Sequence, residues 1–126
     1  MTDPTPLNWL AVIVGVIVAF GGGWLWYGRL FTKAWAEGSR LTEEDGQQMP
    51  MMAMGLQVLG LFLLALVIGV TAQNNALGTA ILAILATSVL VMSGGGFSKK
   101  NTTAVLIDGG YIVMAGVLMI LAQGIF

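Results

Sequence analysis

The stretch MMAMGLQVLGLFLLALVIGVTA, residues 51–72, contains no charged side chain, and it decides the fold class. It has the length of the roughly 20 apolar residues that an α-helix needs to cross a hydrocarbon layer about 30 Å thick. Helices are the natural spanning structure because backbone groups find no water to bond inside lipid. Three further runs are similarly apolar: residues 7–27, 76–97 and 104–126. The sequence therefore predicts an all-α integral membrane protein with four transmembrane helices.

The links between these runs indicate how the helices are arranged. Gln73–Asn75 is a very short link, and helices joined by so few residues pack as antiparallel neighbours. An up-down bundle is therefore expected, in a single domain of residues 1–126. The predicted helices and the long first loop have these bounds: helices at about 7–28, 50–72, 76–97 and 103–125, and a loop at 29–49.

The composition excludes several classes of protein. The chain is 57% hydrophobic and only 9% charged, whereas a soluble domain carries about 25% charged residues. The net charge of −1 argues against a nucleic-acid partner, which requires a basic face. Cysteine and histidine are both absent, so thiolate nucleophiles and the commonest proton shuttle and metal ligand are missing. We therefore expect no cofactor, no metal and no enzymatic activity.

The basic residues predict the orientation. All five fall in two of the gaps between apolar runs: Arg29, Lys33 and Arg40 in the first gap, Lys99 and Lys100 in the third. Lys and Arg are biased toward cytoplasmic loops. Residues 29–49 and 98–101 are therefore expected in the cytoplasm, with both termini outside.

Aromatic residues continue the first helix beyond its apolar run. Trp24, Tyr27, Phe31 and Trp35 recur at steps of three and four, which places them on one helical face, with Arg29 and Lys33 on another. A straight helix from Leu7 to Glu37 would be roughly 46 Å long at 1.5 Å per residue, which exceeds the thickness of the hydrocarbon core. We therefore predict an interfacial helical extension that tilts, or that bends near Gly21–Gly23 or Gly28.

Two interpretations of this extension stay open. The face formed by Trp24, Tyr27, Phe31 and Trp35, together with Lys33, is either a docking surface for a partner or for anionic lipid, or an aromatic belt that anchors the helix end.

Asp108 is the residue most indicative of function. It lies several residues inside the fourth apolar run, and a carboxylate in a spanning segment is costly, usually faces the bundle interior and is a functional hypothesis by default. The residues expected at a similar depth complete a candidate polar cluster: Gln57, Ser93, Arg29 and Tyr111. Arg29 is the expected ion-pair partner. The cluster is interpreted either as a proton or cation relay or as a structural polar clasp.

Two Gly triplets raise the question of an internal repeat. Gly21–Gly23 and Gly94–Gly96 are each followed by an aromatic residue and then by basic residues. A duplicated two-helix hairpin, related by an axis along the membrane normal, explains this pattern. The alternative is coincidence, because Gly is common in membrane helices.

Two further groups suggest metal sites but have simpler explanations. Met49, Met51, Met52 and Met54 are soft ligands that suit Cu(I), yet the last three spread around a helix, so we interpret them as packing residues. Glu43–Asp45 follows Thr42 as the acidic first turn of a capped helix, which explains the charges without a cation.

Several segments together resemble a known family: Asn8–Val12, Trp26–Tyr27, Leu30–Phe31, Lys33–Trp35, Leu41–Asp45 and Leu106–Tyr111. The chain resembles, over essentially its whole length, the bacterial membrane family catalogued as domain of unknown function 1761. The resemblance implies a small four-helix protein without an assigned activity. It implies these characteristic positions: Trp26, Tyr27, Lys33, Trp35, Asp108 and Tyr111. The Ser98–Lys100 link is simpler than the third loop expected of the family.

From these observations we expect a non-enzymatic accessory or structural subunit of a larger bacterial inner-membrane complex, or a homo-oligomer. The alternative is a small oligomeric transporter or channel for an ion or small solute, with Asp108 and Gln57 along the seam between copies. The expected partners are membrane lipid and other membrane subunits or a second copy, but not nucleic acid.

Overall fold

The computed structural model describes residues 7–38 and 51–126, and every ordered element in them is helical. The elements are α1 (Trp9–Leu25), the π-helix η1 (Trp26–Leu30), α2 (Thr32–Gly38), α4 (Met51–Gln73), α5 (Leu77–Phe97) and α6 (Thr102–Ile125). The predictions made for Arg40, Thr42–Asp45 and Met49 lie outside the described residues.

Four helical segments are long and apolar enough to cross a membrane: Trp9–Leu30, Met54–Gln73, Leu77–Phe97 and Thr102–Ile125. This confirms the predicted all-α membrane fold with four spanning helices. Large apolar side chains such as Leu82, Leu90 and Val117 lie exposed on the outer faces, where lipid rather than water is the suitable solvent.

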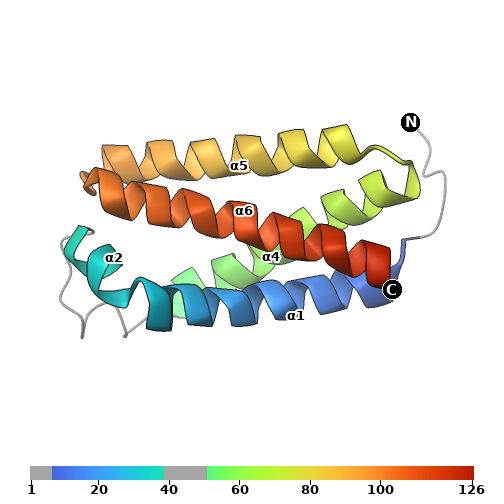
Figure 1. Cartoon of the computed structure of the whole chain (residues 1–126), viewed down its shortest axis with the longest axis horizontal. Coiled ribbons are helices and arrows are strands. Elements are labelled where there is room, and N and C mark those ends of the chain that lie inside the picture. Colours follow the sequence, from blue (N-terminus) through green and yellow to red (C-terminus); the bar gives the residue numbers. More distant parts are fainter. Residues whose placement is uncertain (1–6, 39–50) are drawn as a thin grey trace.

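Helix α6 is the centre of the bundle. It contacts α1, α2, α4 and α5, and α4 and α6 lie between α1 and α5 (Figure 1). α6 is the most buried of the spanning helices and α5 the least. The core is formed by small and branched side chains from all four helices: Val12, Ala19, Leu61, Leu64, Ala65, Ile68, Ala80, Ile84, Tyr111, Ala115 and Met119.

The helices alternate in direction, so the chain segments between them gather at two ends. The end of α1, the start of α4 and the α5–α6 turn lie at one end of the bundle, and the α4–α5 turn and the C-terminus lie at the other (Figure 1). Arg29, Lys33 and Lys100 therefore belong to the same end. The assignment of that end to the cytoplasm stays a prediction.

Both short turns close in the same way. Asn75 and Lys99 adopt left-handed backbone conformations, with φ of 53° and 65°. After α4, the Ala76 amide donates to the Thr71 carbonyl; after α5, the Lys100 amide donates to the Gly95 carbonyl. These bonds are those of a Schellman motif, which satisfies the last carbonyls of a helix. Each turn is thereby fixed by its own backbone.

The extension after α1 bends at the second of the two predicted places, near Gly28. The helix does not bend at the Gly triplet; it widens into the π-helix η1, which contains Gly28, and changes direction at Phe31. The Phe31 amide donates to the Trp26 carbonyl over 3.0 Å, the five-residue step of a π-helix. α2 then packs against α6 at the end of the bundle (Figure 1). The physical reason is the anchoring of η1 and α2 on α6, described below.

The internal repeat stays a prediction. A two-fold repeat of the hairpins α1–α4 and α5–α6 requires that α4 and α6 touch each other and that each touches both outer helices. These contacts are present, but α1 packs on α6 much more extensively than α4 packs on α5, whereas a two-fold axis would make the two interfaces equivalent.

Gly116 tests the close packing of α5 against α6. A Cβ at this position would lie 2.5 Å from Cδ1 and 2.6 Å from Cγ1 of the buried Ile84. We expect Gly116→Ala to lower the free energy of unfolding in detergent by about 1–3 kcal/mol, because overpacking a filled core forces side chains off their rotamers. Gly124→Ala on the same helix meets nothing within 4 Å and is the control, expected to be neutral or slightly stabilising. An equal effect at both positions would contradict the packing.

Candidate functional site

The start of α6 places Asp108 at the end of the bundle that carries the basic residues. Asn101 caps the helix, its Oδ1 accepting a hydrogen bond from the Ala104 amide over 2.9 Å. Asp108 follows within two helical turns and is only 7% exposed. A carboxylate this buried requires compensating donors.

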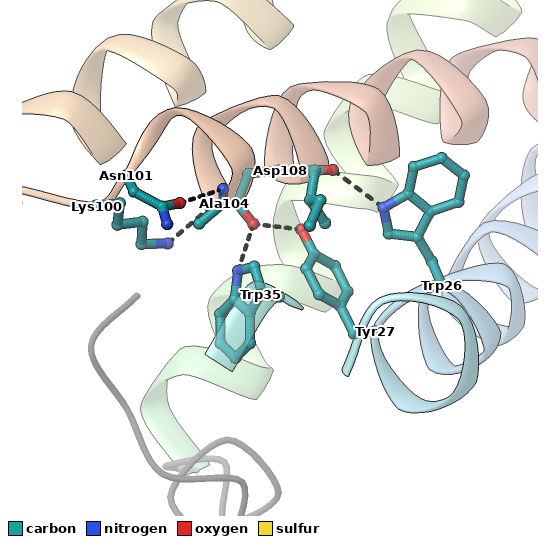
Figure 2. A network of polar contacts seen from close by, with 8 residues as sticks. Trp26, Tyr27, Trp35, Lys100, Asn101, Ala104 and Asp108 are labelled. Atoms are coloured by element: carbon teal, nitrogen blue, oxygen red, sulfur yellow. Dashed lines mark hydrogen bonds and ion pairs between the residues drawn. The ribbon is translucent and has the colours of Figure 1, made fainter. Parts of the chain in front are cut away.

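Three side chains from three different elements supply those donors (Figure 2). The Tyr27 hydroxyl donates to Asp108 Oδ1 over 2.6 Å, and the Trp35 indole N–H donates to the same oxygen over 2.8 Å. Lys100 Nζ lies 2.7 Å from Oδ2 and forms an ion pair. We call Asp108, Tyr27, Trp35 and Lys100 the Asp108 cluster. It joins η1, α2 and the α5–α6 turn to α6.

Aromatic rings enclose the cluster. Tyr27 and Trp35 meet edge to face with ring centroids 5.3 Å apart, and Lys100 Nζ lies 5.3 Å from the centroid of the Trp35 ring. Tyr27 also packs against Tyr111, at 5.4 Å. Trp35 thus contributes its N–H to the carboxylate and its π-face to the ammonium group. The rings shield the Asp108 side of the ion pair, whose side chain is 10% exposed, more than the Lys100 side, which is 24% exposed.

Further hydrogen bonds fasten neighbouring helices to the α6 backbone or to each other. The Trp26 indole N–H donates to the Ile107 carbonyl over 3.0 Å, and the Ser88 hydroxyl on α5 donates to the Gly109 carbonyl over 2.9 Å. The Tyr111 hydroxyl donates to the Ala19 carbonyl on α1 over 3.0 Å. Gly109 permits this close approach: a Cβ there would lie 2.5 Å from Met92 Sδ and 3.2 Å from Ser88 Oγ, so the Met92 side chain would have to move.

The structure brings together only part of the predicted polar cluster. Gln57 on α4 lies near the hydroxyl of Tyr111, which in turn packs against Tyr27 beside Asp108. Ser93 lies exposed on the outer side of α5, whereas Ser88, five residues earlier on the same helix, is buried against α6.

Arg29 is not the ion-pair partner of Asp108, as the sequence had suggested. Arg29 is exposed, and its guanidinium lies 5.6 Å from the centroid of the Trp24 ring. Lys100 takes the expected place. Tyr27 and Arg29 are two residues apart and so lie on opposite sides of the helix, which leaves Arg29 outside when Tyr27 faces α6.

The predicted docking face does not form a single surface. Trp24 is 65% exposed and Lys33 is exposed, but Tyr27 and Trp35 point inward to Asp108 (Figure 2). Phe31 packs on Trp26 instead, with ring centroids 4.8 Å apart. The prediction of one aromatic face, based on steps of three and four residues, assumed one continuous α-helix. The helix breaks at Phe31, so the residues after it point in a different direction.

Lys100 was missed as a site residue although the sequence carried a usable signal. It precedes Asn101, a preferred helix cap, so its side chain can lie along the first turns of α6 where Asp108 is found.

The chemistry available at the cluster is limited. Both carboxylate oxygens already accept bonds from side chains of the same chain. Within residues 7–38 and 51–126, no group of three His, Cys, Asp or Glu residues is placed to hold a metal ion. The arrangement is suited to holding elements together.

Comparison with known families gives one match. The model of a family described as protein of unknown function (DUF1761) matches residues 10–124, which confirms the resemblance found in the sequence. Neither a curated protein nor a solved structure matches this chain.

A pair of double-mutant cycles tests which cation partners Asp108. We expect Lys100→Gln and Asp108→Asn to couple by about 1–2 kcal/mol in the free energy of unfolding, because the two groups share one ion pair. Arg29→Gln and Asp108→Asn should add within about 0.5 kcal/mol. Reversible unfolding in mixed micelles measures both. A larger coupling for Arg29 than for Lys100 would show that the pairing is different.

Proposed function

We propose a structural role for this chain, which belongs to the family described as protein of unknown function (DUF1761). In this proposal it is a non-enzymatic accessory subunit of a larger bacterial inner-membrane complex, or a homo-oligomer. The observation that carries the proposal is the closure of the Asp108 cluster, in which a buried carboxylate is satisfied by Tyr27, Trp35 and Lys100.

A closed cluster supports a clasp better than a relay. A group that exchanges protons or cations needs access to its cargo and a second site to pass it on. Here the donors come from the same chain, and the space between Asp108 and the far end of the bundle is occupied by an apolar core that includes Ile84, Ala115 and Met119.

The exposed outer helices support an assembly role. α5 is the least buried spanning helix, and Gly78, Gly94 and Gly96 on it have open space where a Cβ would stand. Small residues let helix backbones approach closely in a membrane. α5 therefore offers a surface on which a further helix can pack.

A small oligomeric transporter or channel is the second candidate, because a carboxylate inside a spanning segment is a functional hypothesis by default. Its pathway has to run between copies, since the interior of one bundle is filled. Asp108 and Gln57 would be its polar lining, which requires the buried Asp108 cluster to open toward the neighbouring copy.

Asp108→Asn separates the two candidates. For a structural clasp we expect this substitution to lower the free energy of unfolding by about 1–3 kcal/mol, since it removes a charge-assisted hydrogen-bond acceptor. The native assembly, purified gently from membranes and measured by mass, should dissociate more readily. Flux of a panel of ions and small solutes into proteoliposomes should equal the rate in empty liposomes for the wild-type protein and for Asp108→Asn. Thr103→Ala, at an exposed polar position of α6 rather than of α5, is the control.

The opposite pattern contradicts the structural role. If wild-type protein carries flux and Asp108→Asn abolishes it while the assembly keeps its mass, the chain is a transporter. The mass itself distinguishes a lone oligomer from a complex with other subunits. A second measurement uses a single Ser93→Cys variant, which is possible because the chain has no cysteine. Oxidation of this variant gives a disulfide-linked dimer if two copies meet along α5.

A further inference from the structure

The change of direction between η1 and α2 forms a pocket on the outside of the bundle. It has a volume of about 540 Å³, and its lining includes Arg29, Leu30, Lys33 and Glu37. No member of the Asp108 cluster lines it. The pocket and the Asp108 cluster therefore share no residue, although both lie at the same end of the molecule.

The pocket is cationic. Arg29 and Lys33 are both exposed. The ion pair found among the described residues joins Lys100 to Asp108 and does not involve these two pocket residues. Glu37 is the acidic residue on the lining, so the two basic side chains outweigh it. The stacking of the Arg29 guanidinium on Trp24 restricts that side chain but leaves its N–H donors available. An anion is the complementary ligand.

The flank of the pocket is apolar and faces the bilayer. Trp24 is 65% exposed and Leu30 is 60% exposed, next to the basic residues at the end of a spanning helix. This is the depth at which hydrocarbon gives way to headgroups, where Trp and basic side chains are enriched. A ligand that fits both parts has a charged head and an apolar tail.

We propose that this pocket binds the headgroup phosphate of an anionic phospholipid. Arg29 and Lys33 contact the phosphate, and Trp24 and Leu30 lie against the beginning of an acyl chain. Guanidinium and ammonium groups are the side-chain groups that usually donate hydrogen bonds to phosphate in proteins. The apolar flank favours a lipid over a soluble phosphate, which would leave Trp24 and Leu30 without a contact. The proposal goes beyond the structural role and does not depend on it.

Native mass spectrometry of the full chain in a neutral detergent tests the proposal. The probes are phosphatidylglycerol and phosphatidylcholine with identical acyl chains. We expect phosphatidylglycerol to remain bound as a single adduct under conditions that strip phosphatidylcholine. Arg29→Gln and Lys33→Gln should each reduce that adduct about fivefold, since one basic residue near an anionic headgroup changes binding by roughly this factor.

Two further variants control for charge and for folding. Lys99→Asn removes a positive charge from the same end of the bundle, at a residue that does not line the pocket, and Asn tolerates the left-handed backbone there. It should change the adduct by less than twofold. Glu37→Gln removes the acidic residue from the lining and should increase the adduct, a gain that partial unfolding cannot produce.

Three results would overturn the proposal. Equal retention of the two lipids rules out headgroup recognition. An equal loss with Lys99→Asn shows attraction to the whole end of the bundle rather than to the pocket. Displacement of phosphatidylglycerol by millimolar inorganic phosphate shows a site for the free anion, not for a lipid. Arg29→Gln, Lys33→Gln and Lys99→Asn all leave the Asp108 cluster intact, so this experiment stays interpretable whether or not the structural role holds.

Discussion

The carboxylate of Asp108 is the constraint on which this end of the protein depends. A charge buried inside a membrane-spanning helix is stable only when it is paired and hydrogen-bonded. Tyr27, Trp35 and Lys100 meet that requirement from three separate elements. The need to bring Tyr27 and Trp35 to the same oxygen accounts for the π-helix, for the change of direction at Phe31 and for the packing of α2 on α6 (Figure 2).

Much of the fold could be predicted from the sequence, because a membrane imposes strong and simple conditions. The length of each apolar run is set by bilayer thickness, and the spacing of the basic residues follows from alternating crossings. The inward position of Asp108 could be predicted for the same reason, since exposure of a carboxylate to lipid is so costly. Tyr111 and Gln57 were expected beside it because their depth follows from their place along each helix.

The partners of Asp108 could not be predicted, because they depend on local backbone geometry. Arg29 was favoured by its depth, but it lies two residues from Tyr27, on the opposite side of the helix, and contacts Trp24 instead. The left-handed conformation of Lys99 directs Lys100 back along α6, and a helical periodicity contains no information about that turn. Ser93 was likewise chosen for its depth in the membrane, whereas the serine that is buried, Ser88, is set by which face of α5 meets Gly109. The same local geometry creates the basic pocket beside Trp24, which no motif marks.

The distance between α2 and the start of α6 tests the central claim most directly. Spin labels on cysteines introduced at Lys33 and Thr103, both exposed, report this distance by double electron–electron resonance without disturbing the cluster. If Asp108 holds α2 in place, the distribution is narrow in the otherwise wild-type protein and broadens when Asp108→Asn is added. A distribution that is equally narrow, or equally broad, with and without that substitution would contradict the account.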